Sequence, residues 1–195
     1  MINQRIVPAV TNMKDFEKFL ESSLEYCVLM NLHISLMEQM LPMAKKKGKK
    51  VLVHLELIHG LSGDEYGCEY ACQRLRVDGV ISTKGKVVET AKRNKKLAIL
   101  RLFLIDTKSL EKGLNLCSTV QPDYMEVLPG LASSIIPGLK ERVNVPMMSG
   151  GLIRSREQIE ECLKNGACAV TISDMKLALT AFDFLEEIGV METVL

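Results

Sequence analysis

The feature that most constrains this sequence is a regular alternation of short apolar runs with longer amphipathic segments. The apolar runs are rich in Val, Ile and Leu along their whole length, which is typical of parallel strands that helices cover on both faces. The alternation therefore predicts an α/β protein with a parallel sheet. The eight expected strands are Ile6–Val10, Tyr26–Asn31, Val51–Leu57, Gly79–Thr83, Leu97–Leu104, Tyr124–Leu128, Val145–Ser149 and Ala169–Ile172.

Eight strand–helix units favour a closed barrel over an open doubly wound sheet. An open sheet normally carries a glycine-rich phosphate loop after its first strand, and residues 7–12 contain no glycine. The chain has 195 residues, just under the ordinary lower limit of about 200 for this fold. We therefore expect one domain over residues 1–195, a compact TIM-like (β/α)8 barrel with room for one degenerate unit.

Composition excludes several other classes of protein. Hydrophobic residues make up 47% and charged residues 25%, so the chain has enough apolar surface to need a core and is not disordered. No run reaches 18 apolar residues, and the N-terminus does not resemble a signal peptide, so no membrane association is expected. The six cysteines form no CxxC pair, which indicates buried thiols in a cytoplasmic protein.

Several of the apolar strands carry polar side chains near their C-terminal ends. His54 and Glu56 share one face of their strand, Arg101 is the sole charge of the fifth strand, and Glu126 is the sole charge of the sixth. Sites of this fold lie at the C-terminal ends of the strands, so these groups are expected to point into the barrel mouth, together with Ser82, Lys84 and Ser149.

Arg101 and Glu126 lie on neighbouring strands, and a lone buried charge is costly. The two should therefore be paired with each other or bound to a ligand. A structural ion pair that caps the core remains the alternative. If Arg101 contacts a ligand, Arg101→Ala should weaken binding at least tenfold and leave folding largely intact.

The pair Gly150-Gly151 ends the seventh strand, and Ser173 follows the eighth. Loops after these two strands commonly hold a phosphate on backbone N–H groups, because glycine lets the ligand approach the main chain closely. A simple tight turn is the alternative. The spacing of His54, Glu56 and His59 does not suit a metal site, since these residues run from a strand into a loop, and we expect no metal.

Two clusters of basic residues each end a helix and precede a strand, which places both on the N-terminal face of the barrel. The clusters are near neighbours around the ring and are expected to form one patch that suits nucleic-acid phosphates. The alternative is that they complement helix dipoles and solvate two loops. The residues are Lys45, Lys46, Lys47, Lys49, Lys50, Lys92, Arg93, Lys95 and Lys96.

Five segments in order resemble the glycerol-3-phosphate-responsive antiterminator family, and the resemblance extends over nearly the whole chain. They are His54–Leu61, Asp78–Lys84, Arg101–Asp106, Pro122–Gly130 and Ser149–Ile153. The resemblance implies a TIM-barrel-like regulator of glycerol uptake genes, which senses glycerol 3-phosphate, binds a leader messenger RNA, lets transcription pass a terminator and stabilises the transcript.

The resemblance also implies roles for individual residues. The ligand would be surrounded by polar side chains of the mouth, and its phosphate would lie on the loops after the last two strands. Two positions depart from the family pattern, which would have Asp at position 56 and a neutral residue such as Asn at position 174. The implied ligand-binding residues are Glu56, Lys84, Arg101, Glu126, Gly150, Gly151 and Ser173.

Three functions remain open from the sequence. The resemblance favours a regulator without enzymatic activity or cofactor, whose effector is glycerol 3-phosphate, whose partner is leader mRNA, and whose oligomeric state is undetermined between monomer and homo-oligomer. A triose-phosphate isomerase or lyase would use Lys84 to form a Schiff base and Glu126 or Glu56 as general acid/base. A metabolite-binding protein that acts through a protein partner is the third.

Overall fold

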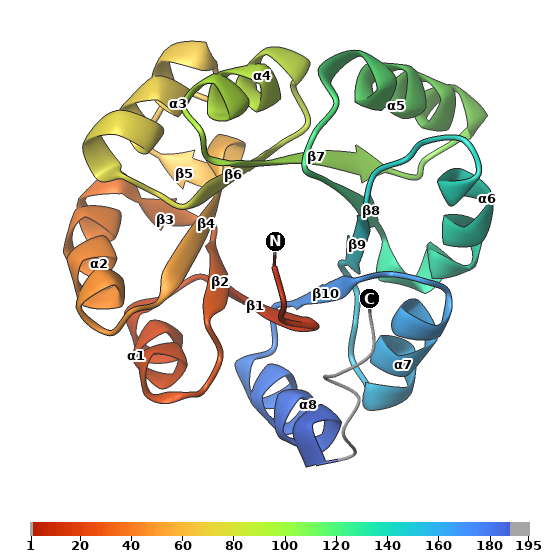
Figure 1. The fold of residues 1–195 in the computed structure, drawn as a ribbon. Coiled ribbons are helices and arrows are strands. Elements are labelled where there is room, and N and C mark those ends of the chain that lie inside the picture. The colour runs from red at the N-terminus through yellow and green to blue at the C-terminus, as the bar shows by residue number, and fades with distance from the viewer. Residues whose placement is uncertain (1, 188–195) are drawn as a thin grey trace.

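Eight parallel strands close into a barrel with helices around its outside (Figure 1). The structure is a computed structural model that describes residues 2–187. Around the ring the strands follow chain order, which confirms the predicted TIM-like barrel. They are β1 (Ile6–Val10), β2 (Tyr26–Leu29), β4 (Lys50–His54), β6 (Gly79–Ser82), β7 (Leu97–Phe103), β8 (Tyr124–Leu128), β9 (Met147–Gly150) and β10 (Ala169–Ile172).

A helix follows each barrel strand, and two of the eight helices adjoin a second helical segment. The third helix continues as a π-helix, η2 (Ala71–Leu75), and the sixth is preceded by a 3-10 helix, η3 (Gly130–Ile135). No unit lacks its helix in the described chain. The helices are α1 (Met13–Glu21), α2 (Ile34–Lys46), α3 (Glu65–Tyr70), α4 (Gly85–Arg93), α5 (Thr107–Val120), α6 (Ile136–Lys140), α7 (Arg156–Lys164) and α8 (Met175–Glu187).

Side-chain caps fix where several helices begin. Asn12 accepts a 2.9 Å hydrogen bond from the backbone N–H of Asp15 at the start of α1. Asp106 accepts one of 2.7 Å from the N–H of Ser109 at the start of α5. These contacts satisfy N–H groups that have no partner inside the helix. None of the helices in residues 2–187 is long and apolar enough to span a lipid bilayer.

The third barrel strand is shorter than its apolar pattern predicts. It ends at His54, and Glu56 lies in a 3-10 turn, η1 (Leu55–Leu57), not in the strand. After this turn the chain forms β5 (Ile58–His59), which pairs with β3 (Leu32–His33) in a separate two-stranded sheet. The Glu56 carboxylate accepts hydrogen bonds from Ser82 and Thr83, and these contacts hold the turn against the end of β6.

The core has two layers, one inside the barrel and one between the barrel and the helices. The inner layer is apolar across the middle of the barrel and includes Val7, Val28, Leu52, Ile81, Ile99 and Met148. At the N-terminal end of the barrel, the N–H of Ile2 donates a 2.7 Å hydrogen bond to the Tyr124 hydroxyl. The N-terminal segment therefore covers the barrel floor, where Figure 1 shows it at the centre of the ring. The charged side chains of the interior lie at the opposite, C-terminal end.

Candidate functional site

A buried ion pair occupies the C-terminal layer of the barrel interior. Arg101 and Glu126 face each other in the register of β7 and β8. Arg101 Nε lies 2.7 Å from Glu126 Oε2, and the two side chains are 8% and 0% exposed. The other carboxylate oxygen accepts a 2.7 Å hydrogen bond from the Thr171 hydroxyl on β10. The predicted pairing of Arg101 with Glu126 is confirmed.

A second polar group lies at the ends of β4 and β6. Glu56 Oε1 accepts hydrogen bonds from the Ser82 hydroxyl and, at 3.2 Å, from the N–H of Thr83. Glu56 Oε2 lies 3.4 Å from His54 Nδ1 but makes no hydrogen bond in the described chain. Neither ring nitrogen of His54 makes one. Three buried polar atoms at the mouth are thus without a partner within residues 2–187.

His54 is electrically neutral in this environment. Burial disfavours the imidazolium, the positive charge of Arg101 adds repulsion, and together they lower the pKa of His54 to about 3. A neutral imidazole has one donor nitrogen and one acceptor nitrogen. The sequence predicts that His54 points into the mouth but does not identify it as a ligand-binding residue, and in the structure it shares the inward face of β4 with Leu52 of the inner core.

Lys84 lies beside this second group at the N-terminus of α4. Its ammonium donates a 2.6 Å hydrogen bond to the carbonyl of Gly63 in the loop before α3. A side chain on Gly63 would meet both Glu56 and Lys84, at 3.2 Å from Glu56 Cγ and 3.6 Å from Lys84 Nζ. Glu56 and Lys84 therefore flank one loop residue, as their assignment to one site requires.

The two glycines after β9 have different structural roles. A Cβ on Gly150 would lie 1.8 Å from the Thr171 hydroxyl, so this glycine makes room for the side chain that binds Glu126. Gly151 has φ +76°, a left-handed conformation that disfavours other residues. Its carbonyl accepts a 3.0 Å hydrogen bond from the N–H of Gly130. The sequence did not reveal that Gly150 serves the ion pair.

The side chains of Ser149 and Asp174 contact the protein backbone. Ser149 does not point into the mouth as predicted, because the inward position belongs to Met148 and the Ser149 hydroxyl lies 3.3 Å from the Val127 carbonyl. Asp174 accepts a 3.0 Å hydrogen bond from the N–H of Leu177 and so caps α8. Ser173 is exposed next to this cap.

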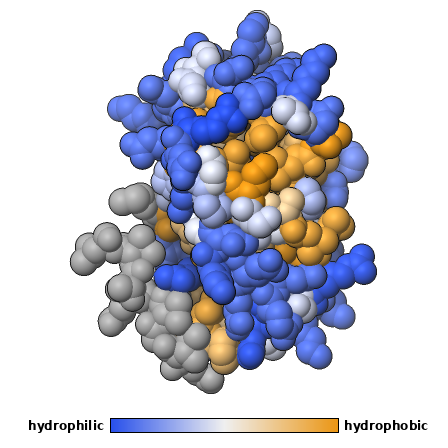
Figure 2. Space-filling model, turned by 90° about the vertical axis from the view of Figure 1, so that its right-hand side faces the viewer, coloured by the Kyte–Doolittle hydropathy of each residue, from blue (hydrophilic) through white to orange (hydrophobic). Residues whose placement is uncertain are grey.

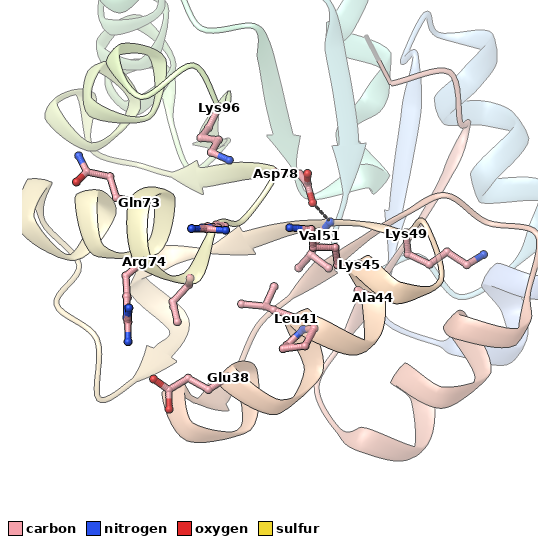
Figure 3. A pocket seen from close by; sticks show the side chains of 13 residues that line it. Glu38, Leu41, Ala44, Lys45, Lys49, Val51, Gln73, Arg74, Asp78 and Lys96 are labelled. Carbon is pink, nitrogen blue, oxygen red and sulfur yellow. Dashed lines mark hydrogen bonds between the residues drawn. The ribbon is translucent and has the colours of Figure 1, made fainter.

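The two lysine clusters lie at the opposite end of the barrel and border the same two clefts. The larger cleft, of about 710 Å³, is lined by Lys45, Lys49 and Lys96 (Figure 3). The smaller one, of about 460 Å³, is lined by members of both clusters, namely Lys50, Lys92, Lys95 and Lys96. The predicted proximity of the clusters is confirmed, and Arg74 and Arg76 add to the first cleft.

Several of these cations are already bound within the protein. Lys49 Nζ donates to the carbonyls of Ser22 and Leu24 at 2.5 and 2.6 Å. Lys47 and Lys50 form ion pairs with Glu21 and Glu25. Lys92 and Arg93 bind Gln121 and Thr90. Within residues 2–187, the side chains of the other four members form no hydrogen bond or ion pair: Lys45, Lys46, Lys95 and Lys96.

The flank of the barrel that carries α5, α6 and α7 has an apolar patch among mostly hydrophilic residues (Figure 2). Four apolar side chains are exposed in the segments that leave β7, β8 and β9. They are Phe103, Ile105, Leu131 and Leu152. In the described residues no three His, Cys, Asp or Glu side chains are placed to hold a metal ion.

A family model and two solved structures identify the family of this chain. The family model described as glycerol-3-phosphate responsive antiterminator matches residues 6–178. The crystal structure of the glycerol uptake operon antiterminator regulatory protein from Listeria monocytogenes is 41% identical, with a TM-score of 0.84 over 88% of this chain and 93% of that one.

Two further relatives are more distant. The glycerol uptake operon antiterminator-related protein of Thermotoga maritima is 27% identical, with a TM-score of 0.78 over 90% of this chain and 98% of that one. The uncharacterized protein YgcP of Escherichia coli is 23% identical over 87% of this chain and 88% of its own. The family match covers most of the barrel, including all the polar residues of its mouth, and the chain therefore belongs to the glycerol-3-phosphate responsive antiterminator family.

Proposed function

We propose that this protein binds glycerol 3-phosphate at the C-terminal mouth of the barrel and, in that state, binds a leader mRNA so that transcription passes a terminator. The observation that carries the proposal is the polar layer of His54, Glu56, Arg101 and Glu126 in an otherwise apolar barrel. Family membership identifies the effector to be tested first. Stabilisation of the transcript belongs to the same proposal.

The charges of the mouth suit a ligand with one anionic and one uncharged end. Glu126 already neutralises Arg101, so the phosphate needs other donors. Lys84 and the backbone around Gly150, Gly151 and Ser173 are the groups we assign to it. The carboxylate of Asp174 caps α8 and disfavours direct phosphate contact with that side chain.

Calorimetric titration with glycerol 3-phosphate tests the effector. Lys84→Met removes one charge at the surface of the site and should weaken binding about tenfold, because a hydrogen bond to a charged group contributes about 1.5–3 kcal/mol. Lys86→Met, two residues further along the exposed start of α4, is the matched control and should leave affinity unchanged. Equal affinity in both variants would exclude Lys84 from the site.

Filter binding of leader RNA with and without glycerol 3-phosphate tests the regulatory step. If the ligand raises RNA affinity by some factor, RNA must raise ligand affinity by the same factor. We expect coupling of about 1–3 kcal/mol. RNA affinity that does not respond to saturating ligand would contradict the proposal.

The RNA surface that we propose is the lysine-rich N-terminal face. Leu97 lines the smaller cleft there, and Arg101 lies four residues further along β7, so about 13 Å of one strand joins the two faces. Neutralising the four lysines without internal partners should reduce the salt dependence of RNA binding by about 0.7 in log–log slope for each phosphate that the variant no longer binds. The four lysines to be neutralised are Lys45, Lys46, Lys95 and Lys96.

A rival location for RNA is the C-terminal mouth, where Lys84, Lys86, Arg154 and Arg156 are exposed. Arg156 is already engaged with Glu160 at 3.1 Å and stacks on the Phe184 ring, which leaves Arg154 and Lys86 as the informative pair there. If Lys86→Met/Arg154→Met abolishes RNA binding and the quadruple lysine variant keeps the full salt slope, RNA binds at the mouth.

The regulatory function is favoured over a Schiff-base enzyme by the position of Lys84. Its ammonium is bonded to the Gly63 carbonyl instead of a carboxylate that could take up its proton. Borohydride reduction in the presence of dihydroxyacetone phosphate should therefore leave Lys84 unmodified. A covalent adduct found on Lys84 by mass spectrometry would establish the enzyme instead.

A further inference from the structure

His54 and Glu56 present buried polar atoms that the protein itself does not satisfy. His54 is 4% exposed, and its Nδ1 and Nε2, like Glu56 Oε2, make no hydrogen bond within residues 2–187. Natural proteins pair nearly all buried polar groups, and each exception calls for an explanation. Here the three atoms are adjacent and lie in the polar layer where we place the ligand.

The hydrogen-bonding character of these atoms follows from their surroundings. Glu56 Oε1 is occupied by Ser82 and Thr83, so Oε2 is the oxygen left to accept a bond. His54 Nδ1 lies 3.4 Å from that oxygen, and we assign the proton of the neutral ring to Nδ1 because this nitrogen is near the carboxylate. Nε2 is then an acceptor, so His54 Nε2 and Glu56 Oε2 both require a hydrogen-bond donor.

A hydroxyl can supply that donor, whereas a carboxylate cannot. An acceptor-only group placed between Nε2 and Glu56 Oε2 would meet two acceptors, and it would add a negative charge beside the Glu56 carboxylate. A site built to bond a hydroxyl rejects analogues that lack it by large factors, because its own polar atoms are then left unpaired.

We propose that His54 and Glu56 recognise the uncharged hydroxyl end of the ligand and exclude three-carbon phosphates that end in a carboxylate. This inference rests on the proposed binding of glycerol 3-phosphate at the barrel mouth. It makes His54 a specificity-determining residue, with Glu56 positioning its proton. The low pKa of His54 keeps this donor–acceptor arrangement constant through neutral pH.

The first test compares glycerol 3-phosphate with 3-phosphoglycerate by calorimetry, since the two share the phosphate and the carbon chain. The wild-type protein should prefer glycerol 3-phosphate at least a hundredfold. His54→Phe keeps a flat ring without polar atoms and should lower glycerol 3-phosphate affinity about tenfold. The exposed His59 is five residues away, and His59→Gln should leave both affinities unchanged.

Glu56→Gln tests the assigned direction of the hydrogen bonds. The amide would donate to His54 Nδ1, which moves the ring proton to Nε2 and makes that atom a donor. The preference against 3-phosphoglycerate should then fall below tenfold. Glu56→Gln with wild-type discrimination would overturn the inference, as would His54→Phe with wild-type affinity and discrimination. A wild-type protein that does not bind glycerol 3-phosphate at all would instead refute the proposed function.

A measurement on the wild-type protein avoids any folding defect of the variants. The chain has three histidines, so ¹⁵N-histidine spectra can be assigned with His59→Gln and His33→Gln. The His54 signals should show a neutral ring with the proton on Nδ1, and the Nε2 resonance should shift on saturation with glycerol 3-phosphate. Unchanged His54 resonances in the saturated protein would overturn the inference.

Discussion

Breaking the Arg101–Glu126 pair from the arginine side should destabilise the fold severely. Arg101→Met removes the guanidinium that lies 2.7 Å from Glu126, and the remaining carboxylate is 0% exposed with the Thr171 hydroxyl as its neighbour. Removing one partner of a buried pair costs about 3–5 kcal/mol, because the other charge is left uncompensated. That is a large part of the roughly 5–15 kcal/mol that ordinarily separates folded from unfolded states.

The burial of the pair revises the expectation that Arg101→Ala leaves folding largely intact. Urea denaturation of Arg101→Met, Glu126→Gln and the double variant measures the interaction as a cycle. We expect the double variant to be more stable than Arg101→Met alone, since the amide that replaces the Glu126 carboxylate carries no charge to compensate. An Arg101→Met protein within about 1 kcal/mol of wild type would refute the reasoning.

A matched control exists on the surface. Arg142 and Glu111 form an ion pair with the same 2.7 Å distance, but their side chains are 46% and 45% exposed. Arg142→Met should cost much less than Arg101→Met, because water and salt screen an exposed pair. Similar losses in the free energy of unfolding for Arg101→Met and Arg142→Met would mean that burial does not determine how much an ion pair contributes to stability. Calorimetry on Arg101 variants is informative only where the folded fraction has been measured.

Three further variants test other interactions of the structure. The pKa of His54 is about 3 in the folded protein and near 6.5 in the unfolded chain, so between these pH values the unfolded chain binds one more proton. The free energy of unfolding should therefore fall as the pH drops through that range, by up to about 1.4 kcal/mol per pH unit. In urea titrations His54→Gln should lack this part of the pH dependence. Gly150→Ala should cost about 1–3 kcal/mol, because its Cβ would lie 1.8 Å from the Thr171 hydroxyl, and adding Thr171→Ala should restore part of the stability. Lys49→Met should lower the melting temperature because the Lys49 ammonium donates hydrogen bonds to two carbonyls, whereas the control Lys46→Met should leave it unchanged. Equal melting temperatures of the two variants would show that the Lys49 bonds are dispensable.

The sequence by itself determined the number and order of the barrel strands. Fully apolar runs bounded by amphipathic segments encode the fold locally, since each strand must be buried on both faces wherever it lies in the ring. The same reasoning predicted that Arg101 and Glu126 are paired or bound to a ligand, because consecutive strands are neighbours in the barrel, and the structure shows that they pair.

Only the tertiary structure decided what the individual polar groups do. Thr171 lies 45 positions from Glu126, and Lys49 reaches carbonyls 25 and 27 positions away, so no local pattern reveals either interaction. The same holds for the end of β4 at His54, which depends on Glu56 reaching β6. Periodicity records which face of an element is buried, whereas the partner of a buried polar atom depends on distances set by the closed barrel. The open nitrogens of His54 are therefore visible only after the chain has folded.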